Sequence, residues 1–188
     1  CIVDWNALNE GQALYLTNLS IRKIGFFDDY STDNGAVISE IKDGCPGVGN
    51  YSALLTTNES SLSSAYLQKE LDGIYDSGSI SLWIKNNNTI ARDVKIPFLF
   101  YNGESTLALI LTPNSSGYSI GIETPANCIT SGIGMLNSEW YNIKVEIHSD
   151  NLILSYRSKE CGLWNVLLNT RIKELRFNAL GVGIETEN

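Results

Sequence analysis

Apolar side chains in this chain recur at every second residue or in short runs, and this pattern constrains the fold more than any other feature. In Ser79–Lys85, the residues Ile80, Leu82 and Ile84 alternate with serines, Trp83 and lysine. Alternation with a period of two places one set of side chains on one face of a β-strand. The pattern therefore predicts a chain built almost entirely from strands.

Similar runs, bounded by Gly, Pro, Asn, Asp and Ser, predict the remaining strands. They are Gly11–Leu19, Ser20–Phe27, Ala36–Ile41, Tyr51–Thr56, Ile96–Tyr101, Ser105–Leu111, Tyr118–Glu123, Trp140–His148, Leu152–Ser158, Leu163–Leu168 and Leu180–Glu185. The segment Ser61–Leu71 has some helical character, which Ser63, Ser64 and Tyr66 weaken. About a dozen strands with almost no helix predict an all-β fold, an antiparallel two-sheet jelly-roll sandwich.

The length and charge of the chain narrow its organisation and its partners. With 188 residues, we expect a single domain over 1–188, with residues 1–10 as an extended N-terminal arm. The 21 acidic and 13 basic residues give a net charge of -8, which argues against nucleic acid as a partner. No apolar run has the length of a membrane-spanning helix.

The four cysteines are widely separated and form no C-x-x-C motif. They are Cys1, Cys45, Cys128 and Cys161. An even number of distant cysteines predicts two long-range disulfides in an exported protein. Three pairings are open, among them Cys45 with Cys128 and Cys1 with Cys161, and the alternative is four buried thiols in a cytosolic domain. For Cys1 two alternatives are open: a lipid-modified cysteine, or an ordinary cysteine at a processing boundary.

Five N-x-[ST] sequons also favour an extracellular or cell-surface location. Their asparagines are Asn18, Asn50, Asn58, Asn87 and Asn114. Three of them, Asn58, Asn87 and Asn114, lie in polar stretches with turn character, where a glycan would project into water. We therefore predict N-glycosylation at all five asparagines.

The acidic segment Asp28–Glu40 contains the strongest metal candidate of the sequence. Its acids partly match the spacing of an EF-hand loop, but Asn34 stands where the loop needs glycine and no flanking helices are expected. A Ca²⁺ site in a loop, formed by Asp28, Asp29 or Asp33, remains as a prediction. The alternative is a solvated turn.

The sequence has little material for catalysis. The single histidine, His148, ends a predicted strand beside Asp150 and has no nucleophile motif to complete a triad. Glu185 and Glu187 would lie on one side of a strand, as glycoside hydrolysis requires of its two acids, but they sit at the end of the chain. We predict that the protein is not an enzyme.

The aromatic residues are the candidates for ligand contact. Trp83, Trp140, Tyr101 and Tyr156 lie within predicted strands and are expected in the core. Another four lie near predicted loops, where a flat ring can stack on a sugar while Asn and Asp bind its hydroxyls. These predicted ligand-binding residues are Trp5, Tyr51, Tyr118 and Trp164.

Two stretches of the chain resemble the concanavalin A-like lectin and glucanase domains, and the laminin-G-like branch in particular. They are the alternating strand with a central Trp at Ser79–Lys85 and the Trp-initiated hairpin Trp140–Arg157. Ala13–Leu16 is similar to an early strand of these domains, and Leu180–Ile184 to a late one. The resemblance covers about two-thirds of the chain and involves core positions, so it bears on fold more than on function.

The resemblance implies a jelly roll of two antiparallel sheets, usually extracellular, that binds glycans or proteins and often Ca²⁺. The Glu-x-Asp-x-x-Glu strand of the enzymes and the metal-binding loop of legume lectins have no counterpart in this sequence. In such domains a further strand follows the one similar to Leu180–Ile184. Here either Ile2–Asn6 takes its place or a sheet edge stays open for a strand of another chain.

Three functions therefore remain as hypotheses. The first is an extracellular or cell-surface, non-catalytic binding or adhesion module of lectin type, with a glycan or a cell-surface protein as partner. The second is a structural subunit of an extracellular filament or coat, assembled by strand exchange between copies. The third, a glycan-active enzyme, is disfavoured because no suitable acid pair is found.

Overall fold

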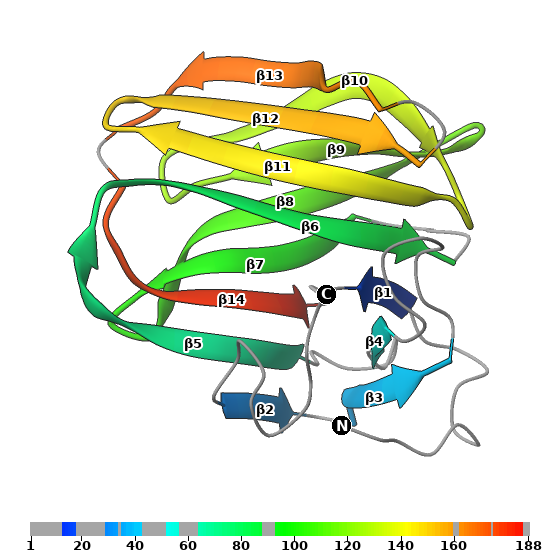
Figure 1. The fold of residues 1–188 in the computed structure, drawn as a ribbon, viewed down its shortest axis with the longest axis horizontal. Coiled ribbons are helices and arrows are strands. Elements are labelled where there is room, and N and C mark those ends of the chain that lie inside the picture. The colour runs from blue at the N-terminus through cyan, green and yellow to red at the C-terminus, as the bar shows by residue number, and fades with distance from the viewer. Residues whose placement is uncertain are drawn as a thin grey trace.

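The computed structural model of the chain is a sandwich of two seven-stranded sheets, A and B, in which every described pairing is antiparallel (Figure 1). It describes residues 13–17, 29–33, 35–42, 52–56, 64–87, 93–159, 162–173 and 175–185. No helix occurs among them, and thus none long and apolar enough to cross a membrane. The prediction of an all-β, antiparallel two-sheet sandwich is confirmed.

Sheet A has the order β13, β12, β11, β6, β1, β4, β3. These strands are β13 (Asn165–Arg171), β12 (Asn151–Ser158), β11 (Trp140–His148), β6 (Ser77–Asn86), β1 (Ala13–Thr17), β4 (Ser52–Thr56) and β3 (Val37–Ile41). Sheet B has the order β10, β9, β8, β7, β14, β5, β2. These strands are β10 (Cys128–Leu136), β9 (Gly117–Glu123), β8 (Glu104–Asn114), β7 (Val94–Tyr101), β14 (Phe177–Glu185), β5 (Ser64–Tyr75) and β2 (Asp29–Asp33).

The core fills the space between the sheets and comes from the alternating apolar positions. In sheet A, Leu82, Ile84 and Ile143 are buried there, and in sheet B the core includes Leu109 and Ile120. A regular strand presents every second side chain to the opposite sheet, so the alternation at these positions is the pattern of the core. Trp83 and Trp140 are buried as expected, although their place on the outer side of sheet A leaves them outside this cluster.

Two tight turns connect strands that the sequence predicted. β7 and β8 are joined by Asn102 and Gly103, both with positive φ, which is the requirement of a type I′ hairpin turn. β11 and β12 form the predicted long hairpin, in which His148 pairs with Asn151 across a two-residue turn. Both connections depend on local sequence alone, and this explains why they were predictable.

Three strands were not predicted. The segment with helical character forms β5, because Ala65 and Leu67 point into the core while Tyr66 points outward, a period of two. The acidic segment expected to be a turn contains the edge strand β2, which pairs with β5. β10 escaped detection because Gly132, with a φ of 71°, and a register shift between Thr130 and Gly134 interrupt its alternation.

The strand similar to a late strand of concanavalin A-like domains does not lie at an edge. It forms part of β14, which pairs with β5 on one side and β7 on the other, as Figure 1 shows. β1 likewise has two neighbours, β4 and β6. Neither strand therefore leaves an open edge, which was one of the two alternatives; the other, Ile2–Asn6, lies outside the described residues. The expected arm over residues 1–10 lies outside the described residues.

Candidate functional site

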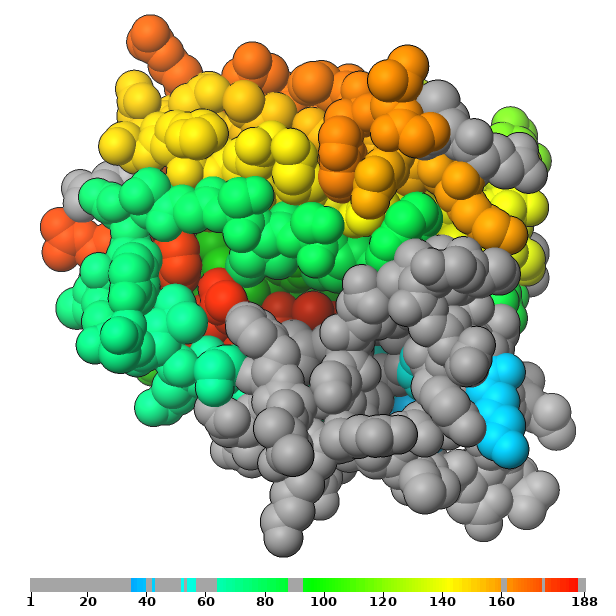
Figure 2. Space-filling view, viewed as in Figure 1, coloured from blue at the N-terminus to red at the C-terminus, as the bar shows by residue number. Residues whose placement is uncertain are grey.

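The outer face of sheet A, turned toward the viewer in Figure 2, carries the long side chains of β6, β11 and β12. Because the inward positions of these strands are apolar, the residues between them project outward. One row across the sheet joins Trp83, Asn142 and Arg157, which are direct partners in the strand register. The next row contains Lys144 two residues along β11. The register thus places a tryptophan and two cations close together.

Trp164, in the segment before β13, completes this group. The ammonium of Lys144 lies 4.9 Å from the centroid of the Trp164 ring, and the guanidinium carbon of Arg157 also lies 4.9 Å from it. Arg157 contacts a second ring, because its guanidinium carbon is 5.6 Å from the centroid of Trp83. Distances below about 6 Å are those of cation–π interactions. We call Trp83, Lys144, Arg157 and Trp164 the Trp164 surface.

The four side chains of the Trp164 surface differ in access to solvent. Trp164 is 36% exposed, whereas Trp83 is buried. Lys144 and Arg157 are half-buried. The ring of Trp164 is therefore the part of the surface that a ligand would reach first.

The charges of the Trp164 surface are only partly neutralised within the described residues. Lys144 forms an ion pair of 2.8 Å with Glu146. Arg157 has no carboxylate partner in that part of the chain, and its buried Nε has no hydrogen-bond acceptor. Two cations face one carboxylate here, in a protein with a net charge of -8. The Trp164 surface is thus more basic than the protein as a whole.

Polar and aromatic groups continue along the same face. Ser81 donates a hydrogen bond of 2.9 Å to the side-chain oxygen of Asn142. Lys85 lies 5.3 Å from the ring centroid of Trp140, in a repetition of the cation–aromatic arrangement. Trp140 is buried, so this second pair does not offer an open ring.

The outer face of sheet B has different chemistry. Lys95 lies between two carboxylates, 2.8 Å from Glu123 and 3.6 Å from Glu185. The Tyr66 hydroxyl donates a hydrogen bond to Glu185, and burial together with this carboxylate raises the pKa of Tyr66 above its usual value. An ammonium between the two carboxylates forms a closed ionic network. This arrangement does not resemble an acid and a base that flank a sugar bond.

Of the predicted ligand-binding residues, Trp164 is on the surface and Tyr118 is not. Tyr118 on β9 is 0% exposed and belongs to the core, and burial raises the pKa of its hydroxyl strongly. The prediction for Tyr118 was wrong because its strand begins at Gly117, so the residue lies inside the sheet and not in the preceding turn. Tyr51 and Trp5 lie outside the described residues.

Two of the three predicted metal residues lie on the edge strand of sheet B. Asp29 and Asp33 are the two ends of β2, which pairs with β5. A Ca²⁺ site at Asp28, Asp29 or Asp33 stays a prediction. Asp28 lies outside the described residues. Within the described residues, no cluster of three or more His, Cys, Asp or Glu residues could hold a metal ion.

The residues predicted for disulfides and glycans are mostly outside the described ranges. Cys128 is exposed at the start of β10. The other three cysteines, Cys1, Cys45 and Cys161, lie outside the described residues, so the disulfides stay a prediction. Asn87 and Asn114 are exposed, as a glycan would require. Glycosylation there, and at Asn18, Asn50 and Asn58, also stays a prediction.

Sequence reasoning missed Lys144 and Arg157. The apolar positions of Trp140–Arg157 predicted the hairpin, but no role was assigned to the residues between them, which point outward. Their signal was available, because Lys144 and Arg157 both alternate with apolar residues on their strands. What the sequence could not show is that Trp164 lies against both of them.

Comparisons with known proteins identify the fold. No family model matches the sequence, and no curated protein matches it either. The structure is similar to the exoplasmic/lumenal domain of VIP36 bound to Ca²⁺ and Man2, with a TM-score of 0.55, 6% identity, and coverage of 84% of this chain and 74% of that one. The Ca²⁺-bound form of that domain aligns with a TM-score of 0.54 and 6% identity over 84% and 76% of the two chains. The chain has the concanavalin A-like fold, as its sequence resemblance implied.

Proposed function

We propose that this concanavalin A-like chain is a non-catalytic, lectin-like binding module of the cell surface or secretory pathway, and that it binds saccharides at the Trp164 surface. The exposed ring of Trp164, held between Lys144 and Arg157, carries the proposal. The similarity to a domain whose solved form holds Man2 supports a saccharide as the ligand.

A ring held in this way is suited to a sugar. The apolar face of a pyranose packs against an aromatic ring, and the ring needs little ordering when its neighbours already fix it. Lys144 and Arg157 both lie against the ring of Trp164 and restrict its position. They also supply hydrogen-bond donors beside the ring, since an ammonium has three N–H groups and a guanidinium has five.

The charges favour an acidic saccharide over a neutral one. Arg157 has no carboxylate partner among the described residues, so an anionic group of the ligand would supply the missing charge. Guanidinium groups bind carboxylate and sulfate oxygens through paired hydrogen bonds. We therefore propose a glycan that carries uronic acid or sulfate groups.

Ca²⁺ is a separate part of the proposal. The VIP36 domain has been solved in Ca²⁺-bound forms, which supports a role for Ca²⁺ in this fold. A Ca²⁺ site formed by Asp28, Asp29 or Asp33 remains part of the proposal. Ca²⁺ is not needed for the proposed contacts at the Trp164 surface.

Titration of the protein with two saccharides tests the proposal. The first is a sulfated glycosaminoglycan hexasaccharide and the second a neutral mannose oligosaccharide of the same length. We expect the sulfated ligand to bind more tightly, with an affinity that falls as salt is added, because salt screens exposed charges. Trp164→Ala should weaken binding at least about tenfold, which corresponds to 1.4 kcal/mol.

Leu163→Ala is the matched control, because Leu163 is the exposed neighbour of Trp164 but has no ring and no cation contact. Equal effects of Trp164→Ala and Leu163→Ala would contradict the proposed site. Equal affinity for both saccharides, with both lost in Trp164→Ala, would keep the site and reject the acidic ligand. Failure of both saccharides to bind would reject the function.

A structural subunit that assembles by strand addition is the second candidate. The observation in its favour is the edge of sheet A, where β13 pairs only with β12 among the described strands and Val166 is 58% exposed. An edge strand with an exposed apolar residue can pair with a strand of another copy. Light scattering after size-exclusion chromatography tests this, and assembly that disappears in Val166→Lys would favour it.

A further inference from the structure

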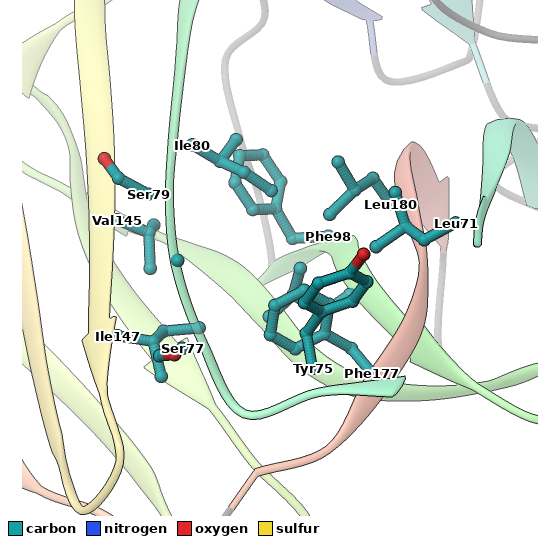
Figure 3. A pocket seen from close by; sticks show the side chains of 12 residues that line it. Leu71, Tyr75, Ser77, Ser79, Ile80, Phe98, Val145, Ile147, Phe177 and Leu180 are labelled. Atoms are coloured by element: carbon teal, nitrogen blue, oxygen red, sulfur yellow. The ribbon is translucent and has the colours of Figure 1, made fainter. Parts of the chain in front are cut away.

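A cavity of about 220 Å³ lies between the two sheets at the turn from β5 to β6, on the opposite face of sheet A from the Trp164 surface. Phe98, Phe177 and Leu180 from sheet B contribute to one side, and Val145 and Ile147 from sheet A to the other. Figure 3 shows these side chains around a common space, with the ring of Tyr75 in front of Phe177. Five strands from both sheets therefore build one apolar chamber.

The cavity opens beside β6, where the described strands give β6 only one neighbour along part of its length. Among the described residues, β1 pairs with β6 only over Trp83–Asn86, whereas β11 pairs with β6 from Ser77 to Lys85. The first half of β6 therefore forms a margin of sheet A, and Ser77–Ser79 are exposed there. Figure 2 shows this hollow between β5 and β6, with atoms of β14 visible inside it.

The rim of the cavity is polar but uncharged. Ser77 and Ser79 contribute hydroxyl groups, and Tyr75 stacks on Phe177 at 6.0 Å between ring centroids. The Tyr75 hydroxyl donates a hydrogen bond to Asp72, which lies outside the lining. Among the residues that the structure describes, none that lines the cavity is charged. An ionised ligand would lose its hydration without gaining a partner, so the chamber selects against charge.

The volume sets the size of the occupant. An apolar protein cavity of about 150 Å³ holds one benzene molecule, so about 220 Å³ accommodates an apolar body of about eight or nine carbon atoms. From volume, apolar lining and uncharged rim together, we propose that this cavity is a binding site for a small neutral apolar molecule, distinct from the proposed saccharide site. A single hydroxyl group on the ligand can reach the serine rim.

Ethylbenzene and phenylacetate form a matched pair of probes for this site. They share the ring and the methylene group, but phenylacetate carries a carboxylate where ethylbenzene has a methyl group. We expect ethylbenzene to bind saturably and, at ten times its Kd, to raise the Tm by about 3–5 °C. Phenylacetate should produce neither effect, because the cavity offers no cation.

Gly78 provides a substitution that fills the cavity from its rim. A Cβ added to Gly78 would meet the Phe177 ring at 3.6 Å, an ordinary contact distance, so Gly78→Val directs its methyl groups toward the cavity without strain. We expect Gly78→Val to abolish ethylbenzene binding. Gly162→Val is the control, because nothing lies within 4 Å of a Cβ built there and the variant should bind ethylbenzene as the unmodified protein does.

Nuclear Overhauser contacts from ethylbenzene to the methyl groups of Val145 and Ile147 in the unmodified protein provide a second measurement that needs no variant. Contacts to both would support the site. Absence of saturable binding, contacts to other residues only, equal binding of phenylacetate, or full ethylbenzene binding by folded Gly78→Val would overturn the proposal.

Discussion

The outer faces of the two sheets differ in the residues that their aromatic rings pack against. On sheet B, Tyr66 and Phe100 pack edge to face at 5.9 Å and lie over Gly183 and Gly181 of β14. On sheet A, the ring of Trp164 lies over no glycine that the structure describes and is contacted by the cations Lys144 and Arg157. The first arrangement buries Phe100 and half-buries Tyr66 against the sheet, and the second keeps the ring of Trp164 accessible.

This difference shows which face is suited to recognition. Glycine has no side chain, so a ring from a neighbouring strand can lie flat on the backbone and lose contact with water. Lysine and arginine have long flexible stems, so they hold a ring from the side and leave its other face open. Two faces of one fold therefore differ in function because of the residues next to their rings.

The largest expected effect compares the same truncation on the two faces. Phe100→Ala should lower the free energy of unfolding by about 3–5 kcal/mol, because Phe100 is 3% exposed and its removal leaves a cavity. Trp164→Ala should lower it by less than about 1 kcal/mol, since that ring is partly in water and is held mainly by its cation contacts. Urea unfolding of both variants measures the difference. Similar losses would mean that the two faces do not differ as described.

The next effect tests the glycines under the rings. In Gly183→Ala the new Cβ would overlap the Tyr66 ring and lie 2.9 Å from the backbone oxygen of Ala65, so we expect a loss of about 2–3 kcal/mol. Gly78→Ala is the control, because its Cβ would make only an ordinary contact. Urea unfolding distinguishes the two, and a tolerated Gly183→Ala would show that the Tyr66 ring moves away freely.

A smaller effect concerns the pH dependence contributed by Tyr66. Burial and the adjacent Glu185 raise its pKa in the folded protein above 10.0, the value of an unperturbed tyrosine. The neutral hydroxyl therefore stabilises the folded state fully below pH 10, and this contribution is lost as the pH rises above it. The stability difference between the unmodified protein and Tyr66→Phe should narrow between pH 9 and pH 11.5. Urea unfolding across this range measures it, and a constant difference would contradict the assigned cause.

The smallest expected effect separates charge from shape at the Trp164 surface. Arg157→Lys keeps the positive charge but loses the planar group that lies against both tryptophan rings. We expect affinity for the sulfated hexasaccharide to fall by about two- to fivefold, or about 0.5–1 kcal/mol, with its salt dependence unchanged. Titration at two salt concentrations measures both quantities. Unchanged affinity and unchanged salt dependence would assign Arg157 a purely electrostatic role.

Much of the fold was predictable where the signal is local. The hairpin of β11 and β12 and the turn at Asn102 and Gly103 were recognised because their residue types act within a few positions. β5 was misread because Tyr66 and the serines before it suit several conformations until β14 and β2 lie beside them. For the site, Trp164 was identified as a candidate but Tyr118 was placed wrongly, since a shift of one residue at the start of a strand moves a ring from a turn into the core.

The sequence by itself determined the class of the protein. Alternation with a period of two specifies strands with one face inward, and two such sheets must pack together to bury those faces. Only the tertiary structure decided which outward residues meet. Trp83, Lys144, Arg157 and Trp164 come from four separate places in the chain, and strand register brings them together. The cavity behind β6 depends in the same way on which strands pair and over what length, and such pairing between distant segments leaves no local pattern in the sequence.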